Sequence, residues 1–216
     1  MKELIGVFAA TVTDNMDPES LGRVRVRVAE AAGLEAVSDV WARVATLMAG
    51  AKRGTWFIPD VGDEVLVAFG RGDPQEPYVL GALWSDANPP AEKMDASNDR
   101  KVLRSRGGVT IVLDDQAGQE SVTLETPGGQ RLVLRDGPGA VEITDTVGNS
   151  ISLGAGGVTV SAAAKVTLRA SMIEVHAGML TVDAGMARFS GVVQCDTLIA
   201  NSVVSASYTP GAGNIW

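Results

Sequence analysis

The sequence predicts an all-β protein in two parts, a small closed barrel followed by a stack of short strands. Up to about residue 90, short runs alternate apolar and polar residues, which is the period of a half-buried strand. From residue 107 the pattern changes to a repeat of apolar pairs separated by turn residues. The composition, with 25 glycines and 5% aromatic residues in 216, fits tight corners and a narrow aliphatic interior better than one large core.

The first part carries most of the bulky aromatic residues and five or six predicted strands. The clearest is Gly22–Val28, GRVRVRV, where three valines face one side and three arginines the other. The predicted strands lie at residues 5–12, 22–28, 40–44, 55–59, 64–69 and 78–84. Turn residues at 60–63 and 71–74 separate the later ones. A closed or nearly closed barrel buries one face of each strand.

These patterns divide the chain into four segments. Residues 1–85 form the barrel domain, and residues 86–106, with Pro89 and Pro90, form a linker. Residues 107–200 form a shaft of repeated strands, and residues 201–216 leave the repeat.

The shaft segment repeats pairs of apolar residues two positions apart, so both members of a pair face the same side. We predict that the following residues line the shaft core: Ile111/Leu113, Val122/Leu124, Leu132/Leu134, Val141/Ile143, Ile151/Leu153, Val158/Val160, Val166/Leu168, Ile173/Val175 and Leu180/Val182. Glycine, asparagine, aspartate and alanine lie between the pairs, where corners are expected.

One such unit is not stable alone. Burying two aliphatic side chains contributes roughly 3–6 kcal/mol, whereas ordering seven residues costs roughly 7–14 kcal/mol in backbone entropy. The units must therefore stack. Either three units of one chain form a coil of a single-chain β-helix, or three chains each contribute one side of a prism.

Composition also excludes several functions. A net charge of −8 argues against nonspecific nucleic-acid binding. One histidine and one cysteine leave little for histidine catalysis, a zinc site or a disulfide. Asp63-Glu64 and Asp114-Asp115 are adjacent carboxylates that point to opposite faces of a strand. We predict no catalytic, cofactor-binding or metal-binding residues, and no apolar run is long enough for a transmembrane helix.

Three stretches carry a resemblance to a known family: GRVRVRV, WARVATLMAG and GTWFIPDVGDEVLVAFGRGDPQEPYVLGAL. They resemble the OB-fold domain of phage baseplate assembly protein V and of the valine-glycine repeat proteins of type VI secretion. The repeat of short strands that follows resembles the intertwined triple-stranded β-helix of the same family. The resemblance covers nearly the whole chain.

The resemblance implies a homotrimeric central spike of a contractile phage tail, a tailocin or a related injection particle. Such a spike is made in the bacterial cytoplasm and assembled into the virion baseplate or particle. It attaches below the tube to a separate hub protein, pierces the target envelope mechanically, and contacts the target membrane only transiently. It is not an enzyme and binds no nucleic acid.

The end of the chain, with Tyr208, Ile215 and Trp216, either plugs the shaft or docks a small PAAR-type tip protein. Two other functions stay open. A trimeric tail fibre or adhesin would bind a receptor through an aromatic-rich distal domain. A single-chain β-helix enzyme that degrades polysaccharides would need longer coils and paired carboxylates in a cleft.

Overall fold

A computed structural model describes residues 3–28, 37–137 and 141–206 of the chain. The chain divides into two units, Met1–Val166 and Thr167–Trp216, and each is described by itself. The described residues contain β-strands and one short 3-10 turn, η1 (Gly70–Gly72), and no α-helix. No helix in this part of the chain is long and apolar enough to cross a bilayer.

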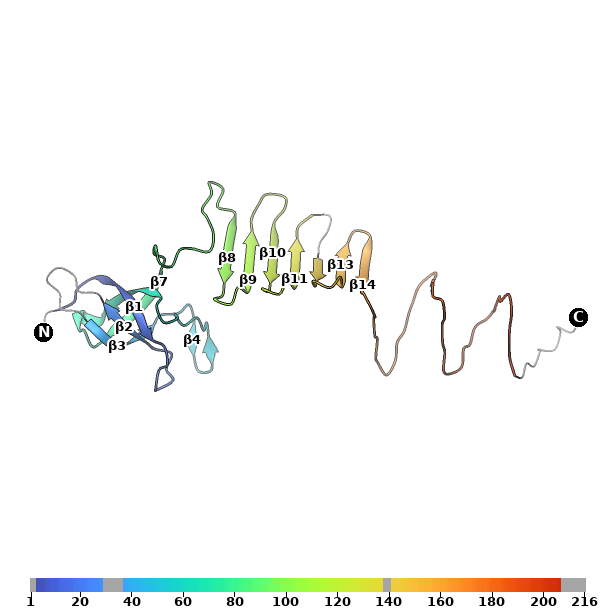
Figure 1. Ribbon diagram of the computed structural model, residues 1–216, viewed down its shortest axis with the longest axis horizontal. Coiled ribbons are helices and arrows are strands. Elements are labelled where there is room, and N and C mark those ends of the chain that lie inside the picture. The colour runs from blue at the N-terminus through green and yellow to red at the C-terminus, as the bar shows by residue number, and fades with distance from the viewer. Residues whose placement is uncertain (1–2, 29–36, 138–140, 207–216) are drawn as a thin grey trace, which may run out of the picture. The chain divides into compact units, whose positions relative to one another are not determined.

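The first part of the chain is a closed five-stranded barrel, as predicted (Figure 1). Its strands, in spatial order, are β1 (Val7–Asp14), β2 (Val24–Val28), β3 (Val37–Val44), β7 (Pro77–Leu83) and β6 (Glu64–Phe69). Neighbouring strands are antiparallel except β3 and β7, which pair in parallel. A separate two-stranded ribbon, β4 (Ala49–Gly50) and β5 (Arg53–Gly54), lies between β3 and β6 in the sequence.

The barrel core consists mainly of small aliphatic side chains. Val24 and Val26 are completely buried, whereas Arg25 and Arg27 between and after them face outward, which confirms the predicted alternation on β2. Phe69 is the one aromatic residue in the buried core cluster, and Phe8 packs against it edge to face with ring centroids 5.7 Å apart. Small side chains suit a barrel of five strands, whose interior is narrow.

One predicted barrel strand is wrong. Residues 55–59 belong to no strand, although their apolar content suggested one. The backbone N–H of Thr55 donates to the carbonyl of Met48 at 3.0 Å, and beyond it Trp56 and Phe57 lie exposed. Trp56, Phe57 and Ile58 are three consecutive apolar residues, so this run does not show the alternation expected of a half-buried strand.

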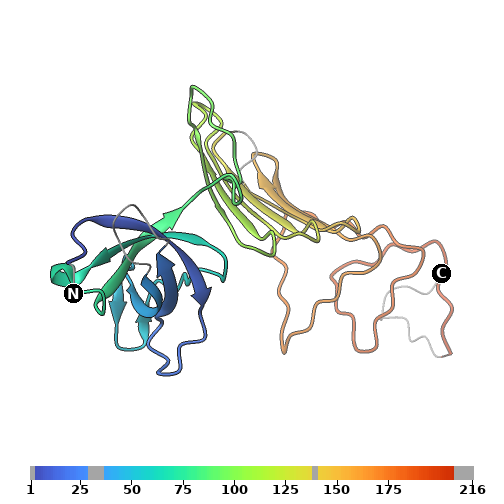
Figure 2. The same cartoon turned by 60° about the vertical axis from the view of Figure 1, so that its left-hand side comes forward.

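The second part is a seven-stranded antiparallel sheet in which each strand pairs with its neighbours in the sequence (Figures 1 and 2). Its strands are β8 (Arg100–Arg104), β9 (Thr110–Asp114), β10 (Ser121–Glu125), β11 (Arg131–Arg135), β12 (Val141–Thr144), β13 (Ser150–Gly154) and β14 (Gly157–Ser161). The sheet is curved rather than flat (Figure 2). Strand β8 lies inside the segment 86–106 that the sequence assigned to the linker.

After β14 the described chain forms no further strand. Residues 162–206 run as extended legs joined by bends, as the trace in Figure 1 shows. The predicted core pairs from Val166 to Val182 lie in these legs. This segment therefore has an extended backbone that joins no ladder within the described part of the chain.

Candidate trimerisation interface

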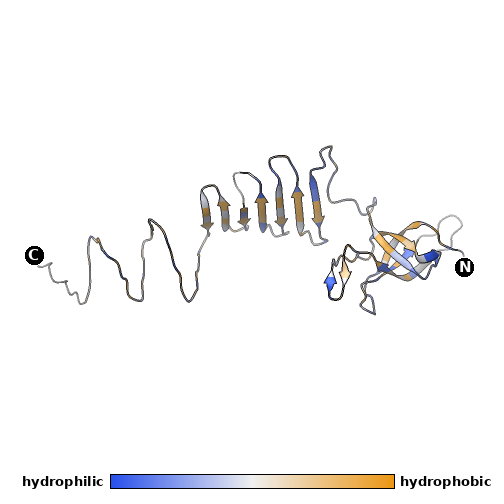
Figure 3. Ribbon diagram, turned by 180° about the vertical axis from the view of Figure 1, so that it is seen from behind, coloured by the Kyte–Doolittle hydropathy of each residue, from blue (hydrophilic) through white to orange (hydrophobic). Residues whose placement is uncertain are grey.

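The strand registers of the sheet bring the predicted core pairs into two continuous rows on one face. One row runs Leu103, Ile111, Leu124, Leu132, Ile143, Ile151, Val160, and the other runs Lys101, Leu113, Val122, Leu134, Val141, Leu153, Val158. Each residue is the direct cross-strand partner of the next in its row, because period-2 alternation keeps both members of a pair on one face. Figure 3 shows hydrophobic colouring along the strands of this sheet.

No described residue of the chain covers the apolar face. Between Ile111 and Val160, nine residues of the two rows have 37% to 69% of their surface exposed to solvent. A hollow of about 710 Å³ lies over this face, and six of its lining residues come from one row: Ile111, Leu124, Leu132, Ile143, Ile151 and Val160. Full burial of each such side chain is worth about 1.5–3 kcal/mol, so a face of this size and continuity requires a partner surface.

The opposite face of the sheet is polar. Arg100 lies 3.7 Å from Asp114, and Arg131 lies 4.0 Å from Glu125, in cross-strand ion pairs. Val133 and its cross-strand partner Thr123 lie in the central row of this face. Val133 is only 3% exposed because long polar side chains lie on both sides of it. Pairs of this kind contribute little to stability, and their charged groups suit a surface in contact with water.

The predicted core residues beyond β14 are likewise not covered by any described part of the chain. Val166, Leu168, Ile173, Val175, Leu180 and Val182 are all exposed in the single chain. Tyr208, Ile215 and Trp216, predicted to dock a tip partner or plug the shaft, lie outside the described residues.

A second surface lies on the barrel, and sequence reasoning did not find it. A hollow of about 1060 Å³ is lined by Arg23, Trp41, Arg43, Trp56, Phe57 and Tyr78 together with the β4–β5 ribbon. We call it the barrel groove. Trp56 is 74% exposed there, although an isolated tryptophan is ordinarily mostly buried. The signal in the sequence was the clustering of aromatic and basic residues within 41–57.

Guanidinium groups lie over two aromatic rings of the barrel groove, those of Trp41 and Tyr78. The Cζ atom of Arg25 lies 4.8 Å from the Trp41 ring centroid, and that of Arg23 lies 5.7 Å from it. Arg43 lies 5.7 Å from the Tyr78 ring. The Nε of Arg25 is buried without a hydrogen-bond partner among the described residues. The groove therefore combines exposed apolar surface with positive charge, in a chain whose net charge is −8.

The described residues that could ligate a metal ion do not gather in one place. Among these residues, no cluster of three or more histidine, cysteine, aspartate or glutamate side chains could hold a metal ion. His176 lies 3.5 Å from the Glu174 carboxylate, and both side chains are exposed. Cys195 is free and exposed.

A closed barrel followed by a sheet with one unpartnered apolar face defines an all-β protein that associates through its second part. Family models match both parts. Residues 8–84 match the type VI secretion system/phage-baseplate injector OB domain, and residues 121–181 match the phage baseplate V C-terminal trimerisation domain. The chain belongs to this family of phage-baseplate and type VI secretion spike proteins.

Curated relatives agree with the family models. The chain is 35% identical over 92 residues to the type VI secretion system spike protein VgrG3 of Vibrio cholerae, covering 40% of this chain and 9% of that protein. It is 34% identical over 132 residues to the spike protein VgrG4b of Pseudomonas aeruginosa, covering 55% of this chain and 16% of the relative. The actin cross-linking toxin VgrG1 of Vibrio cholerae matches over 92 residues, 8% of its length. The chain thus spans less than a fifth of these relatives.

Proposed function

We propose that the protein is the homotrimeric central spike of a contractile injection machine, such as a phage tail or a tailocin. One observation carries this proposal: two rows that are apolar from β9 to β14 run across the strands of a sheet that overlaps the matched trimerisation domain. Three such sheets facing one axis form a prism whose interior is aliphatic and whose outer faces carry the ion-paired arginines and carboxylates.

This architecture suits a mechanical role. In a prism of paired strands, an axial load is shared among many backbone hydrogen bonds, and no long edge is left open along the shaft. Driving such a shaft through an envelope requires no covalent step, so we propose that the protein acts without catalysis. In the proposed arrangement residues 1–85 form a collar, the shaft runs from β8 to residue 200, and residues 201–216 form the tip.

We further propose three contacts for the assembled spike. The hub protein of the baseplate binds the OB domain, and the barrel groove, with its exposed aromatic and basic groups, is the surface that suits this contact. A PAAR-type protein caps the C-terminal end. The target membrane is met only transiently, after the particle has been assembled from protein made in the bacterial cytoplasm.

Solution mass tests the proposal directly. Light scattering on the purified chain should give a species of three chains of 22.4 kDa each. In the producing bacterium, a variant that cannot trimerise should leave particles that fail to kill or infect target cells, although their sheaths still contract. A stable monomer at micromolar concentration would overturn the spike proposal.

A further inference from the structure

The two lateral edges of the seven-stranded sheet carry different charges. Because each strand pairs antiparallel with its neighbours in the sequence, alternate strand ends gather along each edge. Along the edge where β8 begins and β9 ends lie four carboxylates, those of Asp99, Asp115, Glu120 and Asp136. The backbone N–H of Asp115 donates to the carbonyl of Asp99 at 3.0 Å, and that of Asp136 donates to the carbonyl of Glu120 at 2.8 Å. We call these four residues the acidic edge.

The acidic edge has no counter-charge within the described part of its own chain. Arg100, the nearest arginine, pairs with Asp114 instead, and Lys101 and Arg135 form no ion pair with the edge. Like charges at opposed positions of neighbouring strands are destabilising. The carboxylates do not form a metal site among the described residues. Cationic side chains of another protomer are therefore the partners that suit this edge.

The opposite edge of the same strands is basic. Arg104 ends β8, is exposed, and has no ion-pair partner among the described residues. Arg106, in the β8–β9 turn, lies 2.9 Å from Asp60, but its side chain is 82% exposed, so this pair contributes little. Arg131, further along this edge, already pairs with Glu125 of its own sheet. Arg104 and Arg106 are thus the cations that this edge can offer to a partner.

Threefold symmetry brings the two edges together. In a cyclic trimer each contact is heterologous, so a patch on one protomer meets a different patch on the next. When three sheets turn their apolar faces to one axis, each corner of the prism joins one edge of a sheet to the opposite edge of its neighbour. Symmetry also places β8 and β9 of all three chains at the same height along the axis. The acidic edge of one protomer therefore faces Arg104 and Arg106 of another.

We propose that Arg104 and Arg106 of one protomer form ion pairs with Asp99 and Asp115 in the acidic edge of its neighbour. This inference rests on the proposed trimer and names the polar contacts at its corners. From β9 to β14 the apolar rows contain only aliphatic side chains, so their burial alone does little to fix the axial position of one sheet against the next. Charges confined to one end of the edges supply that register, because electrostatic complementarity selects the position at which opposite charges meet.

Arg104 and Asp115 cannot reach one another within one chain. Thr110 is the cross-strand partner of Arg104, and it lies five residues before Asp115 in the sequence. Five extended residues span about 17 Å, whereas substitutions more than about 7–10 Å apart have additive effects. Coupling between substitutions at these two positions must therefore arise between protomers.

A charge-reversal cycle on the full chain tests the pairing. Arg104→Glu alone or Asp115→Lys alone places like charges at all three corners, and should lower the melting temperature of the trimer in low salt by about 2–4 °C. The protein with both substitutions has opposite charges again and should melt close to the wild type. In 1 M NaCl, where the Debye length is about 3 Å, the differences should shrink.

Glu142→Lys is the matched control for Asp115→Lys. Glu142 pairs with Val133 in the middle of the polar face, so its reversal makes the same change in net charge away from both edges. This variant should melt close to the wild type in low and high salt. If it loses as much as Asp115→Lys, net charge and not the corner contact explains the loss, and the inference is wrong.

Additive losses in the double variant, or equal melting of all the variants, would also overturn the inference. If a reversal variant does not assemble, Arg104→Gln and Asp115→Asn replace the two reversals. With the pair present, the double neutral variant should lose no more than either single variant, whereas independent sites give the sum of both losses. Light scattering on the unmodified chain separates the two proposals. A trimer with additive variants refutes only the corner pairing, and a monomer refutes the spike proposal itself.

Discussion

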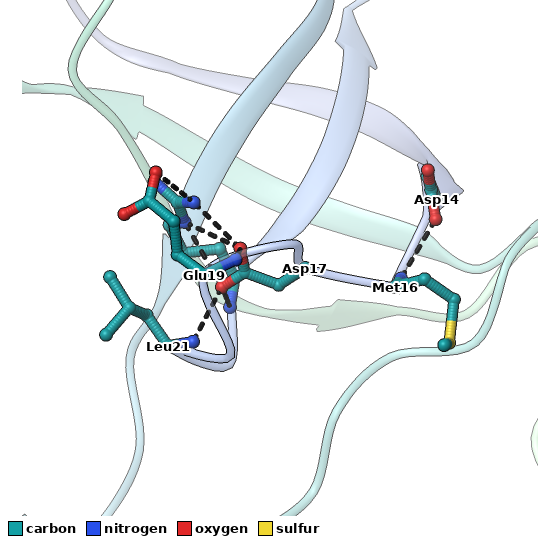
Figure 4. A network of polar contacts seen from close by, with 6 residues as sticks. Asp14, Met16, Asp17, Glu19 and Leu21 are labelled. Carbon is teal, nitrogen blue, oxygen red and sulfur yellow. Dashed lines mark hydrogen bonds and ion pairs between the residues drawn. The ribbon is translucent and has the colours of Figure 1, made fainter.

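The carboxylate of Asp17 accepts a hydrogen bond from Nη2 of Arg23 at 2.7 Å and holds together the loop between β1 and β2. The same carboxylate accepts the backbone N–H groups of Glu19, Leu21 and Arg23 at 2.8–3.2 Å (Figure 4). The Asp17 side chain is only 4% exposed. Arg23 also lies over Trp41, so this single carboxylate fixes one wall of the barrel groove.

Replacing Asp17 should destabilise the barrel in a pH-dependent way. The Arg23 guanidinium and the three backbone N–H groups hold the pKa of Asp17 far below its ordinary value of 3.8. A lowered pKa stabilises the folded state fully above pH 3.8, and this contribution is lost as the pH falls from there toward the folded-state pKa. Asp17→Asn should therefore lower the melting temperature at pH 7 and 5, and by less at pH 3.

Tryptophan fluorescence during thermal unfolding measures this effect, since Trp41 lies beside the loop. Glu19→Gln is the matched control, because Glu19 also contacts Arg23, at 3.0 Å, but its side chain is 64% exposed. Exposed pairs contribute little, so this variant should melt close to the wild type. A difference between wild type and Asp17→Asn that widens as the pH falls below 4 would contradict the assignment.

Two adjacent residues on β12 test which face of the sheet is the interface. Ile143 lies in an apolar row between Leu132 and Ile151, whereas Thr144 points to the polar face. Ile143→Asp would place three carboxylates in the prism interior, which costs several kcal/mol per unpaired buried charge. Light scattering should give the mass of one chain for Ile143→Asp and of three chains for Thr144→Asp. Equal behaviour of the two variants would show that the interface lies elsewhere.

Local alternation made part of this structure predictable. The facing of the β2 valines and of the core pairs in the sheet follows a period of two residues, which can be recognised within five residues of sequence. The closed barrel and the trimerisation domain were expected, and both are confirmed. The exposed position of Trp56 was not predictable, because burial of an aromatic side chain depends on which distant strands pass over it.

Two further features escaped prediction for physical reasons. Strand β8 places Lys101 in an apolar row opposite Leu113, so a charge interrupts the alternation that would have revealed the strand. The end of the sheet at Ser161 could not be predicted from spacing. The step from Ile151 to Val158, which spans the β13–β14 hairpin, is seven residues, and so is the step from Val166 to Ile173, which lies outside any strand.

The last hairpin of the sheet should depend on Gly157 and not on its neighbour Gly156. Gly157 has a φ of +112°, and nothing lies within 4 Å of an added Cβ at either position, so any cost is conformational. Placing an L-residue in this region costs about 1–2 kcal/mol. Gly157→Ala should lower the melting temperature of the trimer, whereas Gly156→Ala should leave it nearly unchanged or raise it slightly. Equal losses would indicate crowding by another chain at this turn.

The barrel groove should carry the proposed contact with the hub. Arg43 is exposed, lies over Tyr78, and has no ion-pair partner within the described part of the chain. Arg43→Glu reverses one charge in the groove, which should weaken hub binding at least tenfold, since removing one member of a desolvated charge pair costs 2–5 kcal/mol. Arg131→Glu, on the polar face of the sheet, is the control. Calorimetry with the purified hub protein should show a loss for Arg43→Glu alone.

A chain that ends after Trp84 should separate folding from assembly. The barrel is closed and has its own buried core, so it should fold without the shaft. The apolar rows that call for a partner all lie in the sheet from β8 onward, so residues 1–84 should behave as a monomer in light scattering. Circular dichroism and a cooperative melt would confirm that the fragment is folded. If it formed a tight trimer instead, the barrel would drive assembly, and Ile143→Asp would then leave the full chain trimeric.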